Sequence, residues 1–156
     1  MTPTRILPDL QCSIICEDIR REVTGMLTLV GVLHAIPVPQ VPFPIFKLFC
    51  MNRWTAGVGQ FTETVRFVAP DGMTVLRKSD IRFALRDASH NTTNVTFLGQ
   101  LQLPTAGVYY MEVLVDDVMK LRYPVPVVLV EPPPGSQPPS PPPSEAEAPG
   151  DQPPTK

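Results

Sequence analysis

The amino-acid sequence predicts an all-β protein, an antiparallel β-sandwich of about eight or nine strands followed by a disordered proline-rich tail. Three observations support this prediction. Short segments of alternating apolar and polar residues recur along most of the chain, turn-forming residues separate them, and no long segment has the roughly 3.6-residue period of an amphipathic helix. Such a series of strands is typical of both immunoglobulin-like and jelly-roll sandwiches, and the sequence leaves the two types open.

Composition divides the 156 residues into three parts. Residues 1–9 form a short lead-in, in which Pro3 and Pro8 oppose regular structure. Residues 10–131 form the expected sandwich domain, which is long enough for one hydrophobic core. Residues 132–156 contain eleven of the 21 prolines and no aromatic or branched aliphatic residue. Because this tail has too little apolar surface to offset its ordering entropy, we expect it to be disordered.

The segment from Gly99 to Asp117 shows the clearest strand pattern. Alternate residues from Tyr109 to Val115 are apolar, which predicts a strand with one buried face. The Gly-x-Tyr sequence that ends at Tyr109 resembles the tyrosine corner of immunoglobulin-like sandwiches, in which the phenol bonds to nearby backbone. We therefore expect Tyr109 to fix the corner before an inner strand.

The segments that precede it also predict strands. A first strand is expected over 10–18, with Cys12 and Cys16 on one face. Residues 27–36 are apolar on both faces, which predicts a central strand covered on both sides or a sandwich-core strand. A helix is the alternative, but Gly31 and the β-branched residues disfavour it. Residues 37–44 contain four prolines and are expected to form an extended connector that leaves the sheet.

Turn signals and prolines place the other strands. The Pro70-Asp71-Gly72 tripeptide predicts a tight hairpin, because Asp-Gly readily supplies positive φ values. Pro124 and Pro126 restrict the last part of the domain to a sheet edge or a break between two strands. The expected strands lie at residues 45–54, 61–69, 73–77, 81–85, 95–103, 109–115, 119–123 and 127–130.

A set of motifs spread over residues 10–131 resembles a bacterial family of small proteins that is catalogued as a domain of unknown function. The motifs are I-I-C-E-D-I-R-R-E at 14–22, T-L-V-G-V at 28–32, P-F-P at 42–44, V-A-P-D-G at 68–72 and P-x-x-G-x-Y-x-x-x-V-x-V-D at 104–116. The resemblance implies an immunoglobulin-like β-sandwich in a bacterial cytosolic protein. It implies no catalytic residues.

The three cysteines, Cys12, Cys16 and Cys50, predict reduced thiols in a cytoplasmic protein, because their number is odd and the first residues do not form a secretory signal. Cys12 and Cys16 lie ~13 Å apart along one expected strand, too far for a disulfide. Such a pair also lacks the turn geometry of zinc ligands. Asp116 and Asp117 indicate an acidic hairpin tip rather than a calcium-binding loop. No segment approaches the ~20 apolar residues of a membrane span, so we expect no membrane partner.

The charges nearly balance, with 13 basic and 15 acidic side chains. Residues 132–156 hold three of the acidic and one of the basic side chains, so the rest of the chain carries twelve of each sign. A neutral body lacks the basic excess that attracts nucleic acid. Four basic side chains between residues 77 and 86 are interleaved with Asp80 and Asp87, which indicates a solvated strand face.

The sequence shows no catalytic set. A nucleophile needs a base within reach, and His34 and His90 are the only imidazoles. We interpret His34 as a core or edge residue of an apolar strand and His90 as a solvated turn residue. Glu17 and Asp18 are neighbours on a strand and point to opposite faces, which argues against joint acid–base work. We therefore expect no enzyme, no cofactor and no metal site.

Two segments offer candidate partner contacts. In the connector at 37–44, Val38, Val41 and Phe43 form either an exposed apolar edge or a cap on the end of the sandwich. In the tail, Pro141 belongs to P-x-x-P spacing that suits an aromatic groove, although a spacer role explains the same composition. Both pairs of interpretations stay open.

These observations predict a non-enzymatic protein-interaction or scaffold module with a protein partner, and they are compatible with a homo-oligomer. The alternative is a small-ligand binder that holds a lipid, sugar or metabolite between its sheets or at its loop end. Neither hypothesis involves nucleic acid or a membrane.

Overall fold

A computed structural model of the protein describes residues 4–131 and 134–135, and this part of the chain is all-β without a helix. The all-β prediction is confirmed. The described residues form eleven strands rather than eight or nine. The expected segments 27–36 and 95–103 each divide into two strands, residues 43–45 at the end of the expected connector add another, and the segments 73–77 and 81–85 form one strand. The strands are β1 (Asp9–Arg21), β2 (Leu27–Val32), β3 (Ile36–Val38), β4 (Phe43–Ile45), β5 (Phe49–Thr55), β6 (Gly59–Val68), β7 (Val75–Leu85), β8 (Asn91–Phe97), β9 (Leu101–Leu103), β10 (Gly107–Val115) and β11 (Val118–Leu129).

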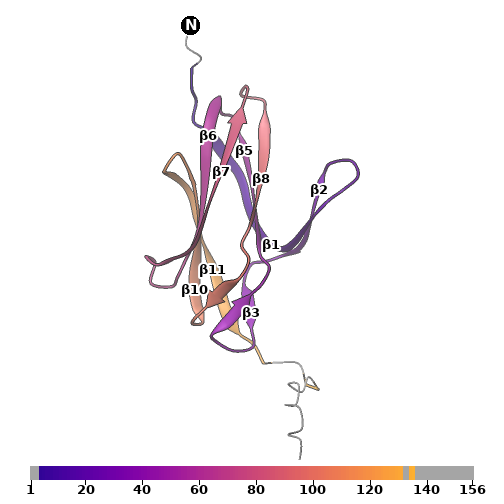
Figure 1. The fold of residues 1–156 in the computed structure, drawn as a ribbon, viewed down its shortest axis with the longest axis vertical. Helices are drawn as coiled ribbons and strands as arrows, with labels where there is room; N and C mark the ends of the chain where they lie inside the picture. Colours follow the sequence, from indigo (N-terminus) through magenta and orange to yellow (C-terminus); the bar gives the residue numbers. More distant parts are fainter. Residues whose placement is uncertain (1–3, 132–133, 136–156) are drawn as a thin grey trace, which may run out of the picture.

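Two large sheets form the body of the molecule (Figure 1). The first has the strand order β2-β1-β5-β8, and the second has the order β3-β11-β10-β6-β7. Strands β4 and β9 form a separate small sheet. All pairings are antiparallel except that of β3 with β11, which is parallel.

The hydrophobic core lies between the two large sheets. Its main cluster joins Ile15 and Cys50 of the four-stranded sheet to Phe67 and Tyr109 of the five-stranded sheet. A second cluster surrounds Trp54, with Phe61, Leu85, Val113 and Val115. Because side chains alternate along a strand, the residues between these core positions face outward and form the two outer faces of the molecule.

The tyrosine corner predicted at Tyr109 is confirmed. The Tyr109 hydroxyl donates a hydrogen bond of 2.7 Å to the carbonyl of Thr105, four residues upstream. Its ring is fully buried and stacks on Phe67, with the ring centroids 5.4 Å apart. This side chain therefore ties the turn before β10 to the main core.

The prediction of one central strand over residues 27–36 is wrong. The segment divides into β2, which is the outermost strand of the four-stranded sheet, and β3, which belongs to the other sheet. His34 lies in the exposed bend between them, so it is neither a core residue nor a strand residue. The apolar pattern is continuous because β2 and β3 follow each other closely and each adds apolar side chains to a different sheet.

The final two predicted strands are one strand, β11. Pro124 and Pro126 pair with Tyr110 and Val108 of β10 on one side. On the other side, β3 pairs with β11 only from Val127 onward. The two prolines therefore lie where the second edge of β11 has no ladder partner among the described residues, which agrees with the expectation of an edge.

The expected tail begins at residue 132 and lies, apart from residues 134–135, outside the described residues. Its disorder stays a prediction.

Candidate functional site

Strand β1 extends beyond β5, its neighbour in the four-stranded sheet. Its first part, from Asp9 to Cys16, pairs with β5, and its second part, from Cys16 to Arg21, pairs with β2 alone. Residues 17–32 therefore form a two-stranded ribbon, which we call the arm. Figure 1 shows the arm projecting from the body beside β8.

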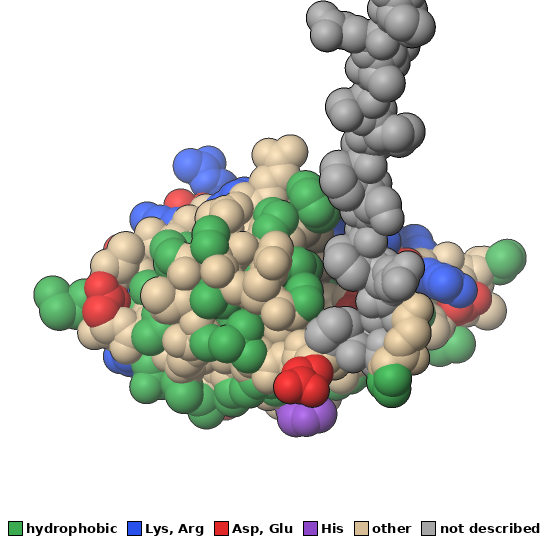
Figure 2. Space-filling view, turned by 90° about the horizontal axis from the view of Figure 1, so that it is seen from below, with side chains coloured by type: hydrophobic (Ala, Val, Ile, Leu, Met, Phe, Trp, Pro, Cys, Tyr) green, Lys and Arg blue, Asp and Glu red, His purple; other side chains and the backbone are tan. Residues whose placement is uncertain are grey.

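The tip of the arm exposes apolar side chains. Glu22 and Met26 close the turn through a backbone hydrogen bond of 2.8 Å, and Gly25 supplies the positive φ of 86° that this turn requires. Val23 is fully exposed, and Met26 is 67% exposed. In Figure 2 the arm extends to the right of the body and carries a hydrophobic side chain at its end. Apolar residues on a projecting ribbon are typical of a contact surface.

A groove of about 620 Å³ lies between the arm and the four-stranded sheet. We call it the arm groove. Leu27 and Leu29 of the arm are half-buried, and Met51 of β5 is 6% exposed. Arg21 and Arg53 add positive charge, so the lining combines apolar and polar groups, as protein interfaces do. The lining residues are Arg21, Gly25, Met26, Leu27, Leu29, Met51, Arg53, Asn91, Thr92 and Thr93.

The outer face of the four-stranded sheet is apolar over much of its area. Cys50, Asn52 and Trp54 face the interior, so Phe49 and Met51 face outward. The strand register extends this face sideways in two rows, Val32–Cys16–Phe49–Phe97 and Ile14–Met51–Val95. Val32 and Phe97 are more than half exposed. A sheet whose outward face is apolar is suited to cover by another surface.

The outer face of the five-stranded sheet is charged instead. The Glu112 carboxylate lies 3.0 Å from Arg66 Nε and 3.7 Å from Arg122 Nη1. Beside this group, Thr64 donates a hydrogen bond of 2.6 Å to Asp80. Arg66, Glu112 and Arg122 thus form ion pairs on this face, and Lys78, Asp80 and Arg82 of β7 are exposed, as the sequence predicts for a solvated strand face. Arg77 is instead half-buried and donates a hydrogen bond to the Gly99 carbonyl. The outer faces of the two sheets therefore differ in polarity.

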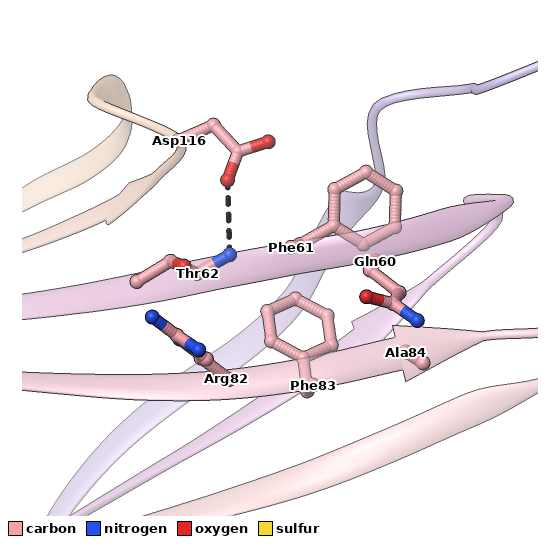
Figure 3. A pocket seen from close by; sticks show the side chains of 7 residues that line it. All are labelled: Gln60, Phe61, Thr62, Arg82, Phe83, Ala84 and Asp116. Atoms are coloured by element: carbon pink, nitrogen blue, oxygen red, sulfur yellow. Dashed lines mark hydrogen bonds between the residues drawn. The ribbon is translucent and has the colours of Figure 1, made fainter.

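A shallow depression of about 470 Å³ lies near the β10–β11 turn, over β6 and β7 (Figure 3). Asp116 from that turn accepts a hydrogen bond of 2.9 Å from the backbone N–H of Thr62 and forms an ion pair with Arg5. Burial alone would raise the pKa of Asp116, but these two partners hold it below its ordinary value. The predicted acidic tip thus fastens a turn to β6. Among the described residues no group of three His, Cys, Asp or Glu side chains is arranged to hold a metal.

A buried polar cluster occupies the interior between the sheets. Trp54 Nε1 and Asn94 Nδ2 both donate hydrogen bonds to Glu63 Oε2, the second at 3.1 Å. Glu63 and Asn52 are fully buried, and burial raises the pKa of Glu63 above its ordinary value. Sequence reasoning missed Glu63, although its place among Phe61, Val65 and Phe67 on the apolar face of one strand was a readable signal.

Cys50 belongs to the same interior. Its Sγ lies 3.7 Å from Ser13 Oγ, which is hydrogen-bonded to the Tyr123 hydroxyl at 3.0 Å. Burial raises the pKa of Cys50 to about 11, so this thiol is protonated at neutral pH and a poor nucleophile. His90 lies in a turn, where its Nδ1 accepts a hydrogen bond of 3.2 Å from the Arg86 backbone N–H.

The connector residues predicted to contact a partner pack inward. Val38 is fully buried in the main core, because its pairing with Leu129 in the β3–β11 ladder turns its side chain toward the interior. Val41 and Phe43 are partly buried and pack against the same core. The exposed apolar edge is therefore wrong for Val38, and these side chains cap the end of the body. Pro141 lies outside the described residues.

The described residues thus define a class, an all-β protein of several sheets with a filled interior and one apolar outer face. Residues 11–128 match DUF6941, described as a family of unknown function, and the chain belongs to this family. The match confirms the expectation of an uncharacterised domain. No curated protein matches the chain. In the part of the chain that the structure describes, no helix is long and apolar enough to cross a membrane.

Proposed function

We propose that the protein is a non-enzymatic protein-interaction module that binds a protein partner in the arm groove. The observation that carries this proposal is the contrast between an apolar outer face beneath a projecting arm and a charged outer face on the other sheet. The proposal includes an immunoglobulin-like sandwich, which the tyrosine corner favours, and a setting in the bacterial cytoplasm.

The free edge of β2 supports the same role. β2 is the terminal strand of its sheet and pairs only with β1, so its second edge presents unpaired backbone groups within the described chain. A partner strand that pairs with such an edge gains main-chain hydrogen bonds, and apolar pockets beside the edge select its side chains. Leu27 and Leu29, on β2 itself, supply the apolar part of the groove.

The alternative of a small ligand held between the sheets has less support. Trp54, Tyr109 and Phe67 are fully buried there and fill the space that such a ligand needs. The shallow depression at Asp116 is another candidate for a small polar ligand, but its aspartate is already bonded to Thr62 and Arg5.

The test compares partner capture by three full-length chains. The wild type and a control with Met73→Ser should retain the same partner, whereas Val23→Ser with Met26→Ser should lose it. All three positions are strongly exposed, so none of the changes should alter folding. Native mass spectrometry of the three chains measures self-association in the same experiment. Equal capture by all three chains, or neither a partner nor self-association for the wild type, would contradict the proposal.

A further inference from the structure

Away from the arm groove, the apolar outer face of the four-stranded sheet ends at a group of three phenylalanines, Phe46, Phe49 and Phe97. Phe46 is 72% exposed and Phe97 is 56% exposed. The rings of Phe49 and Phe97 lie 5.2 Å apart at 48° to each other. We call these three residues the phenylalanine patch. By contrast, Phe61 and Phe67 on the facing sheet are buried in the interior.

The patch is held together by its backbone surroundings. The Phe97 ring covers Gly99 so closely that a Cβ on Gly99 would collide with it, and the Phe46 carbonyl would lie 3.3 Å from the same Cβ. Lys47 lies 5.6 Å above the Phe49 ring. The Phe97 ring thus rests on Gly99 and beside Phe49, and exposed aromatic rings are the usual contact surface for an apolar ligand.

Proline-rich segments are the ligands that aromatic surfaces bind with little entropic cost. A polyproline helix is already formed before it binds, and its rings pack against aromatic side chains. The chain itself carries such a segment, P-P-S-P-P-P at residues 138–143, which has the P-x-x-P spacing. We propose that the phenylalanine patch binds residues 138–143 of the same chain.

The chain leaves the body close to the patch. Val130 N donates a hydrogen bond of 2.9 Å to Val38 O, so β11 ends beside β3. Ile36 and Pro37 of β3 share a small pocket of about 140 Å³ with Lys47, the neighbour of Phe46. As a polyproline helix, the seven residues from 131 to 138 would span about 22 Å. The strand β3, which lies between the end of β11 and the small pocket, is roughly 10 Å long, so the segment is long enough to pass it.

The charges beside the patch balance one another. Lys47 Nζ and Arg20 Nε lie 2.9 and 3.8 Å from the two oxygens of Asp18, and Glu17 lines the same small pocket as Lys47. The proposal therefore rests on the aromatic surface and the proline segment, and not on the acidic residues Glu145 and Glu147 that follow it. The inference goes beyond the proposed function, because its ligand is the chain itself and no external partner is involved.

The test uses the full-length chain labelled with 4-fluorophenylalanine and observed by fluorine NMR. Phe46→Leu and Phe97→Leu assign the two exposed patch resonances. Serine at positions 138, 139, 141 and 142 should shift both resonances, and serine at the distal prolines 149, 153 and 154 should leave them unchanged. The resonance of the buried Phe67 should stay constant in every chain. A synthetic peptide of residues 137–144, added to the first variant, should move the patch resonances back toward the wild-type positions.

Three results would overturn the proposal. The patch resonances would be the same in the wild type and the first variant, or both proline variants would shift them equally. The third is a wild-type shift that disappears on dilution, which would mean that the segment belongs to another copy. A shift that is independent of concentration supports binding within one chain. Loss of partner capture in the arm variant is a separate measurement, so the two proposals fail independently.

Discussion

Replacing Glu63 by glutamine should remove a dependence of stability on pH that the buried cluster creates. Burial, the largest effect, raises the pKa of this carboxyl above its ordinary value of 4.5, although hydrogen bonds from Trp54 and Asn94 and the nearby Asn52 amide oppose it. The folded chain therefore holds the Glu63 proton more tightly than the unfolded chain does. The stabilisation is fully present below pH 4.5 and is lost as the pH rises through the folded pKa.

The magnitude follows from the difference of one bound proton. Between the two pKa values, the free energy of unfolding should fall by about 1.4 kcal/mol for each pH unit. Asp71 and Asp87 act at lower pH, because hydrogen bonds lower their pKa values below 3.8 and their contribution is lost only on acidification. Cys50 acts at higher pH, between 9.0 and about 11. Glu63 should therefore dominate the interval between pH 4.5 and its own folded-state pKa.

Urea unfolding at a series of pH values measures this slope. Trp54 is the single tryptophan and bonds directly to Glu63, so its fluorescence reports the cluster, and circular dichroism gives the independent probe that two-state analysis needs. Glu63→Gln keeps the size and acceptor of the side chain but cannot ionise, so its slope should be flat in this interval. Glu131→Gln, at an exposed position, should retain the wild-type slope. Equal slopes for the wild type and Glu63→Gln would refute the reasoning.

Three further substitutions test the packing. Tyr109→Phe removes the hydrogen bond to the Thr105 carbonyl and should lower the free energy of unfolding by about 1 kcal/mol, measured in urea. Val38→Ala should lower the free energy of unfolding by roughly 2 kcal/mol in the same assay, because two buried methyl groups are lost. An unchanged free energy of unfolding would mean that the Val38 side chain is exposed. Gly99→Ala should cost less than about 1 kcal/mol, since the exposed Phe97 ring can swing into solvent, but it should move the Phe97 fluorine resonance. An unchanged Phe97 resonance would mean that the ring does not cover Gly99.

Sequence reasoning succeeded where the signal was local. The Tyr109 strand and the hairpin at Pro70-Asp71-Gly72 depend on period-two patterns and turn chemistry, and both lie where the sequence places them. The loop of the hairpin is wider than the tight turn that Asp-Gly predicts: the β6–β7 ladder closes at Val68 and Val75, and of the Asp-Gly pair only Gly72 has a positive φ, of 75°. Such patterns show where a strand runs and which residues share a face. They do not show which strand lies beside it.

Those local patterns could not predict the arm. Whether residues 27–36 form one strand or two depends on a pairing partner far along the chain, since β2 pairs with the neighbouring β1 but β3 pairs with the distant β11. The burial of Val38 has the same origin, because the β3–β11 pairing and not the local prolines turns its side chain inward. Glu63 differs from both. Its position on an apolar strand face was readable in the sequence, whereas its partners Trp54 and Asn94 lie on other strands.

One strand connects the buried cluster to the arm groove. Along β5, Asn52 and Trp54 face Glu63, while Met51 and Arg53 line the groove on the opposite side. Glu63→Ala should leave the buried donors of Trp54 and Asn94 unpaired, at about 1–3 kcal/mol each, and should loosen the floor of the groove together with the interior. Weaker partner binding by this variant should therefore be accompanied by weaker protection of β5 amides from hydrogen exchange. The arm-tip variants should weaken partner binding while the protection of β5 amides stays unchanged. This comparison distinguishes residues that contact the partner from residues that stabilise the groove.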